Sequence, residues 1–151
     1  MAMNTTEQAR AYEQKLFPGC SAPLRETDPE FMERFENFAF DEVVNSDDLD
    51  DRTRMMAILA TLLGCQGVEL FQVMLPAALE AGVTPVEAKE IVYQGAAYLG
   101  MGRVYPFLKA ANEVLSARGI SLPLEGQATT TPDTRLADGE QAQVDIFGDG
   151  M

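Results

Sequence analysis

Apolar residues recur along most of the chain at the three- and four-residue spacing of an α-helix. The first long example covers residues 28–44, where Phe31, Phe35 and Phe38 are separated by charged and amide side chains. The Asp-Pro pair at its start suits a helix, because a carboxylate caps free N–H groups and proline lacks the donor that would go unsatisfied there. The pattern therefore predicts an amphipathic helix with the three phenylalanines on its apolar face.

A more uniformly apolar stretch follows, in which every residue from Met55 to Leu63 except Thr61 is apolar. A helix with apolar side chains all round should be central and surrounded by other elements. The acidic run at residues 46–51 is interpreted as the start of this helix, since the helix dipole favours carboxylates in the first turn. The run lacks the glycine and the distal glutamate of a calcium loop, so it predicts no metal site.

Capping and terminating residues divide the rest of the chain into further helices. Thr84-Pro85-Val86-Glu87 is a capping box with proline at the first helical position, the clearest of these patterns. No segment alternates between apolar and polar residues well enough to predict a strand, so the expected fold class is all-α with five to seven helices. Residues 18–27 are expected to form a loop. The remaining helices are predicted at residues 5–17, 68–81, 84–99, 103–118 and 135–147.

These elements fall into three regions. Residues 1–27 supply an N-terminal helix and loop, residues 28–119 the core, and residues 120–151 a polar connector with one short helix. The connector is rich in threonine and contains Gly126 and Pro132, so we do not expect it to add to the core.

Composition restricts the kind of protein and its partners. The chain carries 24 acidic residues against 11 Lys and Arg, a net charge of −13, and 46% of its residues are hydrophobic. Nucleic-acid binders and peripheral membrane proteins need a basic surface, so neither partner is expected. The longest stretch without a charge, residues 55–68, is shorter than the ~18 residues that a transmembrane helix needs. With no apolar signal-peptide segment and only two cysteines, a cytoplasmic single-domain protein is expected.

The absence of histidine limits the chemistry further. It removes the usual general base near neutral pH, the commonest metal ligand and every Ser–His or Cys–His nucleophile pair. Two cysteines without histidine do not make an ordinary structural zinc site, so no metal and no resident cofactor are predicted. Any chemistry must use thiol, carboxylate, tyrosine or lysine groups, or a borrowed cofactor.

Candidate catalytic residues follow the break after the central helix. Cys65 precedes the next helix, where free N–H groups and the helix dipole favour a thiolate, and it is either a reactive thiol or a small buried residue. Glu69 falls one turn later on the same face and is a proton shuttle if it is buried, or a solvated carboxylate otherwise. Gln72 lies close to that face and is a candidate amide donor to a substrate carboxylate. Cys20 is a second thiol that pairs with Cys65 only if the fold brings the two together.

Candidate substrate-binding residues lie on either side of this segment. Arg52 and Arg54 open the central helix, and either pair with the preceding aspartates or bind a substrate carboxylate. Tyr98 is a further candidate for substrate binding. With Tyr93 and Tyr105, it is otherwise a core or interface ring with a satisfied hydroxyl.

An ordered set of short motifs carries a family resemblance. The set resembles the carboxymuconolactone decarboxylase family, related to the alkylhydroperoxidase-D-like proteins, over about two-thirds of the chain. The resemblance implies an alkylhydroperoxidase-D-like helical bundle, assembly into a homotrimer or homohexamer, and a pocket for a small-molecule substrate near a subunit interface. The matching motifs are Asp28-Pro29-Glu30-Phe31 with Phe38, Leu49-Asp50-Asp51-Arg52-Thr53-Arg54, Leu63-Gly64-Cys65, the segment from Ala77 to Glu87, and Tyr98-Leu99-Gly100.

The chain departs from the family pattern at its chemical centre. Redox members resemble this segment but carry Cys-x-x-Cys followed by a histidine, whereas here Cys65 matches the first cysteine and Val68 stands at the second. Counting onward from Cys65 places Gln72 at the position of the family's histidine, and counting back from Gly82 places Met74 there. The glutamate that many members carry after the Arg-x-Arg pair is replaced by Met55. Neither a dithiol peroxidase nor a histidine-dependent decarboxylase is therefore supported.

Three functions stay open. The first is an enzyme: either a lyase that acts on a small carboxylated or lactone substrate, or an antioxidant with single-thiol, peroxiredoxin-type activity through Cys65. The second is a catalytically silent subunit of an oligomer, and the third is a small-molecule binding or scaffold module. Because some family members are tandem duplications, residues 131–148 also resemble the opening helix of a second copy, and a complementary copy with an intact histidine is a further hypothesis.

Overall fold

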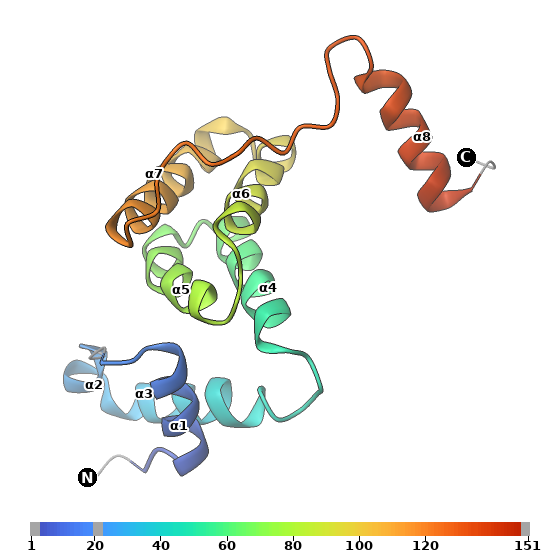
Figure 1. The fold of residues 1–151 in the computed structure, drawn as a ribbon. Coiled ribbons are helices and arrows are strands. Elements are labelled where there is room, and N and C mark those ends of the chain that lie inside the picture. The colour runs from blue at the N-terminus through green and yellow to red at the C-terminus, as the bar shows by residue number, and fades with distance from the viewer. Residues whose placement is uncertain (1–3, 20–22, 149–151) are drawn as a thin grey trace.

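The computed structural model describes residues 4–19 and 23–148, and these residues form helices and loops without a strand (Figure 1). The predicted all-α fold class is confirmed. The predicted number of five to seven helices is too low, because the described residues contain eight α-helices and one π-helical turn. The elements are α1 (Glu7–Leu16), α2 (Leu24–Thr27), α3 (Pro29–Asn37), the π-helical turn η1 (Phe38–Glu42), α4 (Asp51–Gly64), α5 (Val68–Glu80), α6 (Pro85–Leu99), α7 (Met101–Ala117) and α8 (Arg135–Phe147).

The first three helices and η1 form an N-terminal unit, in which α1 packs on α3 and η1. The hydroxyl of Thr6 caps α1 by accepting a hydrogen bond from the backbone N–H of Ala9 (3.1 Å), and it donates one to Asp41 of η1 (2.7 Å). The rings of Tyr12 and Phe17 lie 6.1 and 6.2 Å from that of Phe40, which η1 supplies. Capping and aromatic packing thus hold α1 against η1.

A charged cluster is buried inside this unit. Glu36 is only 1% exposed, and its carboxylate accepts hydrogen bonds from Arg25 Nε (2.8 Å) and from the hydroxyl of Thr5 (3.3 Å). Arg25 also forms an ion pair with Glu13 of α1. The bond to Glu36 raises the pKa of Arg25 above its ordinary value. Because a buried carboxylate is costly without partners, the α2 segment that carries Arg25 is needed to balance Glu36.

Helices α4 to α7 form a four-helix core. Arg52 and Glu87, in the first turns of α4 and α6, form an ion pair, while Leu63 and Gly95 meet near the opposite ends, so these two helices run in the same direction. A Cβ on Gly95 would lie 2.6 Å from Leu63 Cδ2, which shows how closely the two backbones approach. On the other side, the rings of Phe71 (α5) and Phe107 (α7) meet edge to face at 5.3 Å. The short links from α4 to α5 and from α6 to α7 therefore lie at one end of this core.

Two helix starts differ from the sequence prediction. The segment at residues 18–27, expected to be a loop, contains α2, because a single turn is too short to show apolar periodicity. Helix α4 begins at Asp51 and not at residue 46. Asp47 accepts a hydrogen bond from the N–H of Leu49 (2.9 Å) and so forms a turn, and Asp50 is the true cap, accepting from the N–H of Thr53 (2.9 Å). Aspartates favour both capping and turns, so composition alone did not separate the two roles.

The apolar helix α4 and the apolar face of α3 and η1 are less covered than their sequences suggest. Met55 and Leu59 of α4 are fully buried, but Ala57, Ala60 and Thr61 on another face are exposed, so the prediction that α4 is surrounded is wrong for this chain alone. In α3 and η1 the phenylalanines at 31, 35 and 38 are also exposed, with Phe31 62% exposed. The buried positions of α3 are Met32 and Glu36 instead.

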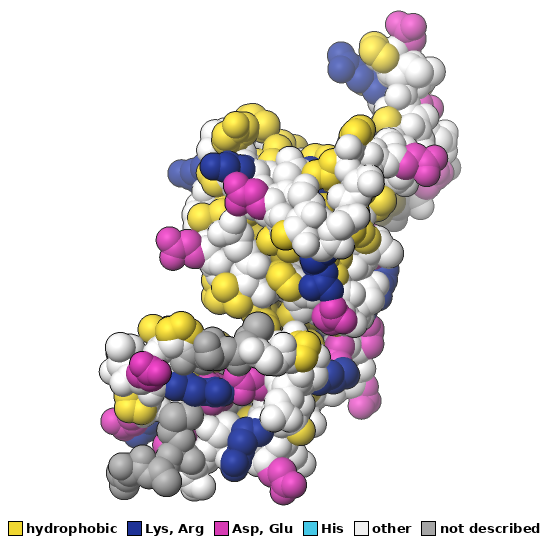
Figure 2. Space-filling model, turned by 60° about the vertical axis from the view of Figure 1, so that its left-hand side comes forward, with side chains coloured by type: hydrophobic (Ala, Val, Ile, Leu, Met, Phe, Trp, Pro, Cys, Tyr) yellow, Lys and Arg dark blue, Asp and Glu magenta, His cyan; other side chains and the backbone are white. Residues whose placement is uncertain are grey.

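The last helix, α8, lies apart from the core. Its predicted range of residues 135–147 is confirmed. An extended connector leads from the end of α7 across the core to α8, which projects at the end remote from the N-terminal unit (Figure 1). All residues of α8 are exposed. Hydrophobic side chains are visible over the core part of the molecule in the space-filling view (Figure 2).

Candidate functional site

The corner between α4 and α5 carries the predicted catalytic residues. Helix α4 ends at Gly64, and Gln66 adopts a left-handed conformation (φ 64°) before α5 begins. The backbone N–H of Gly67 donates to the carbonyl of Leu62 (2.9 Å), which closes the turn. A Cβ on Gly67 would lie 3.2 Å from the Leu62 side chain, so a residue without a side chain suits this tight corner.

Cys65 lies at the end of α4 with its side chain exposed. Its sulfur lies 3.6 Å from the position that a Cβ on Gly67 would take, and Gly67 is the N-terminal cap residue of α5. Among the described residues no side chain caps α5. The N–H groups of Gly67 and Val68 bond to the carbonyls of Leu62 and Gln66, so those of Glu69 and Leu70 are the ones at this helix start that are open to an anion. The thiol itself donates a hydrogen bond to the carbonyl of Leu62 (3.6 Å). The predicted alternative of a small buried residue is therefore wrong, whereas reactivity of the thiol stays a prediction. Cys20, its suggested partner, lies outside the described residues.

Glu69 and Gln72 follow Cys65 on α5 but meet different surroundings. Glu69 is exposed in the first turn of the helix. Gln72 is half-buried, and its amide donates a hydrogen bond to the carboxylate of Glu113 on α7 (3.1 Å). Glu69 is thus open to solvent in the first turn of α5, while the amide of Gln72 is already bonded to α7.

Tyr98 is brought to the same end of the core as Cys65. Gly95 of α6 packs against Leu63 of α4, and Tyr98 follows Gly95 by three residues, about one helical turn. Its side chain is 80% exposed. Tyr93 and Tyr105 are exposed as well, so none of the three tyrosines is a core ring in this chain.

Arg52 and Arg54 lie at the opposite end of α4. Eleven residues separate Arg54 from Cys65 in sequence, which corresponds to about 16 Å along a helix axis. Arg52 is exposed and forms the ion pair with Glu87 that joins α4 to α6. The fold therefore separates the two predicted arginines from the predicted thiol.

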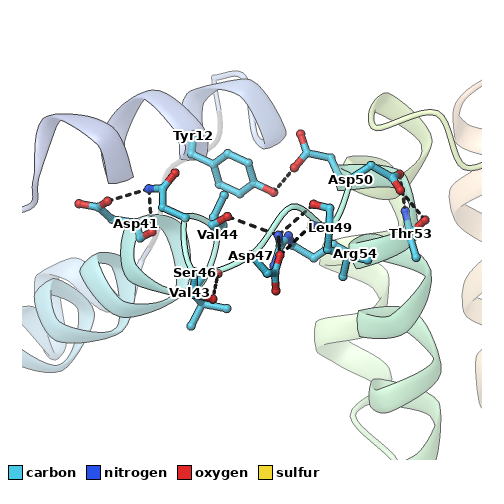
Figure 3. Close-up of polar contacts among 12 residues, drawn as sticks. Tyr12, Asp41, Val43, Val44, Ser46, Asp47, Leu49, Asp50, Thr53 and Arg54 are labelled. Carbon is cyan, nitrogen blue, oxygen red and sulfur yellow. Dashed lines mark hydrogen bonds and ion pairs between the residues drawn. The ribbon is translucent and has the colours of Figure 1, made fainter.

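Arg54 holds the loop that precedes α4 (Figure 3). Its Nη2 donates to the carboxylate of Asp47 (3.0 Å) and to the carbonyls of Leu49 (3.0 Å) and Val44 (3.4 Å). The side chain is buried, and its Nε has no partner among the described residues. The N–H of Leu49, with Arg54 beside it, lowers the pKa of Asp47 below its ordinary value. The contacts of Arg54 are thus those of a loop-holding residue.

A second polar group joins the N-terminal unit to the core at this end of α4. The hydroxyl of Tyr12 and the ammonium of Lys15, both on α1, donate to the carboxylate of Asp51 at 2.7 and 2.5 Å. Figure 3 draws the bond from Tyr12. The bond from Lys15 lowers the pKa of Asp51, while burial and the nearby carboxylate raise the pKa of Tyr12. These two bonds tie α1 to the first turn of α4.

Two hollows lie on the N-terminal side of the molecule. One measures about 380 Å³ and the other about 330 Å³. None of the predicted site residues lines either of them. The first is lined by Thr5, Arg10, Glu13, Gln14, Phe17, Gly19 and Arg25, and the second by Gln8, Ala11, Tyr12, Lys15, Phe40, Val44 and Asn45.

One residue that sequence reasoning missed lies at the end of the core that carries Cys65. Arg103 is in the first turn of α7, next to Val104, whose side chain would contact a Cβ on Gly95 at 3.5 Å. It is exposed and forms no ion pair with the residues that the structure describes. The sequence indicated it only as a lone cation just after two glycines, Gly100 and Gly102. A cation there is better placed than Arg52 or Arg54 to meet an anion at the Cys65 corner.

Two negative findings concern the described residues alone. None of their helices combines the length and the apolar character needed to cross a membrane. Within the same ranges, His, Cys, Asp and Glu side chains nowhere gather in a group of three that could hold a metal ion.

Comparisons with known proteins identify the family. A search of curated proteins found no match. The model of the carboxymuconolactone decarboxylase family matches residues 29–113, which is more than half of the chain and extends from the start of α3 into α7. The chain therefore belongs to the carboxymuconolactone decarboxylase family.

Proposed function

We propose that this chain is the subunit of a homo-oligomeric enzyme that acts on a small carboxylated or lactone substrate at the corner between α4 and α5. The observation that carries the proposal is the family match, which includes both helices of this corner as well as α6 and most of α7. The exposed thiol of Cys65 beside the uncapped start of α5 supports the location.

Three side chains at this end of the core have chemical roles in the proposal. Arg103 and the free N–H groups of α5 hold the substrate carboxylate, because a helix start and a guanidinium both favour anions. As CO₂ leaves, the electron pair of the broken C–C bond stays on the substrate, and the thiol of Cys65 delivers the proton that neutralises the resulting carbanion. Glu69, open to solvent, then returns a proton to the sulfur.

Self-association is part of the proposal, because large apolar side chains remain exposed on several helices. Tyr98, Met101 and Tyr105 are exposed where α6 joins α7, near the Cys65 end. Exposed apolar surface of this kind is typical of protein interfaces. A homotrimer or homohexamer that covers this surface would also shield the Cys65 corner from bulk solvent.

A turnover assay tests the proposal. Consumption of a carboxymuconolactone by the full chain is compared with that by Cys65→Ser and Arg103→Gln. We expect Cys65→Ser to lower kcat at least about tenfold, and Arg103→Gln to raise KM about tenfold, since one charged contact contributes roughly 1.5–3 kcal/mol. Arg118→Gln, at the far end of the same helix and paired with Glu80, is the matched control and should change neither value.

The same assay with an alkyl hydroperoxide tests single-thiol peroxidase activity. There the thiolate would attack the peroxide oxygen, release the alcohol and become a sulfenic acid, which an external thiol must reduce. Peroxide consumption that is lost in Cys65→Ser, without lactone turnover, would replace the decarboxylase proposal by this one.

A catalytically silent subunit is the second candidate, and specific observations favour it. The chain contains no histidine, and Met55, at the position of the family's glutamate, is fully buried in the core. The amide of Gln72 is bonded to Glu113. A folded, associated protein that consumes neither substrate would support this candidate and contradict the first.

A further inference from the structure

Helix α8 is an amphipathic element without a partner among the described residues. Leu136 is 73% exposed and Ile146 is 72% exposed, and Phe147 at the end of the helix is exposed as well. An isolated helix shorter than about 12–15 residues is marginal in water, and α8 has 13 residues. Packing of its exposed apolar side chains on another surface would therefore stabilise α8.

A second unpartnered apolar face lies on α3 and η1. Phe31, Phe35 and Phe38 are all exposed, and the rings of Phe31 and Phe35 stack at 6.1 Å. We refer to these three residues as the phenylalanine face. The seven steps from Phe31 to Phe38 correspond to about 10 Å along a helix. Leu136 and Phe147, which share one face of α8, are eleven steps or about 16 Å apart, so α8 is long enough to cover the phenylalanine face.

The charges beside the two surfaces are mostly acidic. Arg135, at the start of α8, is the only cation of that helix, which also carries three carboxylates. The only cation of α3 and η1 is Arg34, which already forms an ion pair with Glu30 of its own helix. A contact between the two surfaces therefore depends on their apolar side chains and not on charge.

The position of α8 favours a partner surface on another molecule. Helix α8 and the N-terminal unit lie at opposite ends of the chain, with the core of α4 to α7 between them (Figure 1). We infer that α8 of one copy packs on the phenylalanine face of a second copy. This inference rests on the proposed self-association and names the surfaces that produce it.

The apolar area is of the right order for such a contact. An aromatic side chain buries roughly 150–250 Å² when it is fully covered. Each copy offers three partly exposed phenylalanines and donates its own α8, so on the order of 600 Å² of each copy would be covered, against about 800 Å² per partner in a typical stable interface. The exchange thus accounts for most of the area that a stable interface needs.

A mixing experiment tests the exchange. The tail variant carries Leu136→Asp and Phe147→Asp, and the face variant carries Phe31→Glu and Phe38→Glu. All four side chains are exposed, so neither variant should lower the unfolding midpoint of the core. We expect the Kd for self-association of each variant alone, measured by native mass spectrometry and sedimentation velocity, to be at least tenfold higher than that of wild type. An equal mixture should form a one-to-one pair, because the intact α8 of one variant meets the intact face of the other.

The outcomes separate this inference from the proposed function. A wild-type chain that stays monomeric at about 100 µM, well above a micromolar Kd, would overturn both. Association that the tail variant leaves unchanged would overturn only the exchange, and would point to the α6–α7 surface or to another partner for α8. Variants that lose association but form no pair when mixed would also overturn the exchange, since α8 would then act within its own chain.

Discussion

At the scale of single residues, the bond between Tyr12 and Asp51 shows how one hydroxyl joins two parts of the molecule. Tyr12 lies on α1 and Asp51 in the first turn of α4, so the bond fixes the N-terminal unit against the core. Tyr12→Phe removes this bond and leaves the ring in place. We expect it to lower the free energy of unfolding by about 1 kcal/mol at neutral pH. Chemical unfolding of both proteins measures the difference.

The pH dependence of the same variant provides a second readout. The pKa of Tyr12 is raised in the folded state, so its contribution to stability is fully present below about pH 10 and is lost as pH rises towards the higher folded value. Wild type should therefore lose more stability above about pH 10 than Tyr12→Phe does. The exposed Tyr98→Phe is the control, and equal alkaline slopes for all three proteins would contradict the assignment.

The sequence predicted the position of a residue well where local geometry determines it, and poorly where tertiary contacts determine it. Cys65 lies where predicted, at the corner before α5, because the glycines on both sides define that corner. Arg54 was a candidate for binding substrate, but it is buried and holds the loop before α4. Arg103 was not predicted as a site residue, because its place near the Cys65 corner depends on which helix ends pack together. No local sequence pattern predicts that packing.

At the scale of elements, the packing of α6 on α4 depends on one glycine. A Cβ at Gly95 would lie 2.6 Å from the Leu63 side chain. Gly95→Ala should therefore cost about 1–3 kcal/mol by overpacking, although alanine favours helix by up to about 1 kcal/mol. Gly64→Ala is the matched control, because nothing lies within 4 Å of the position that a Cβ there would take, and Gly64 ends α4 in the same region. A Gly95→Ala protein as stable as Gly64→Ala would show that the two helices separate easily.

The sequence predicted elements in proportion to the strength of their end signals. The capping box at Thr84 is present as predicted, with Thr84 and Glu87 each satisfying a backbone N–H of the other. Helix α8 also has its predicted bounds. The predicted start of α4 was wrong because four aspartates within five residues are equivalent candidates for the cap. Only the contacts of Asp47 and Asp50 distinguish them.

At the scale of the whole molecule, acid should unfold the protein through a set of carboxylates at helix starts. The pKa values of Asp47, Asp50 and Glu87 are lowered chiefly by backbone N–H groups, and that of Asp51 by Lys15. A lowered folded pKa gives stability that is present above the ordinary value and is lost as pH falls through the folded one. The thermal unfolding midpoint should therefore decrease as the pH is lowered from about 5 to about 3. A midpoint that is constant or rises over this interval would contradict the assignment.

The whole-molecule arrangement is what the sequence could not supply. Periodicity predicts that Phe31, Phe35 and Phe38 share a face, and they do, but it does not say whether that face is covered by the same chain. The same holds for the exposed side of α4. Both faces are apolar in the sequence and exposed in the single chain, which is why we propose self-association.

Turnover of a carboxymuconolactone by the full chain tests the central claim most directly. Loss of the lactone and release of CO₂ are followed together, with wild type and Cys65→Ser at equal concentration. We expect wild type to release one CO₂ per lactone consumed and Cys65→Ser to be at least about tenfold slower. A folded, associated wild type that releases no CO₂, or a Cys65→Ser protein as fast as wild type, would contradict the claim that this corner carries the reaction.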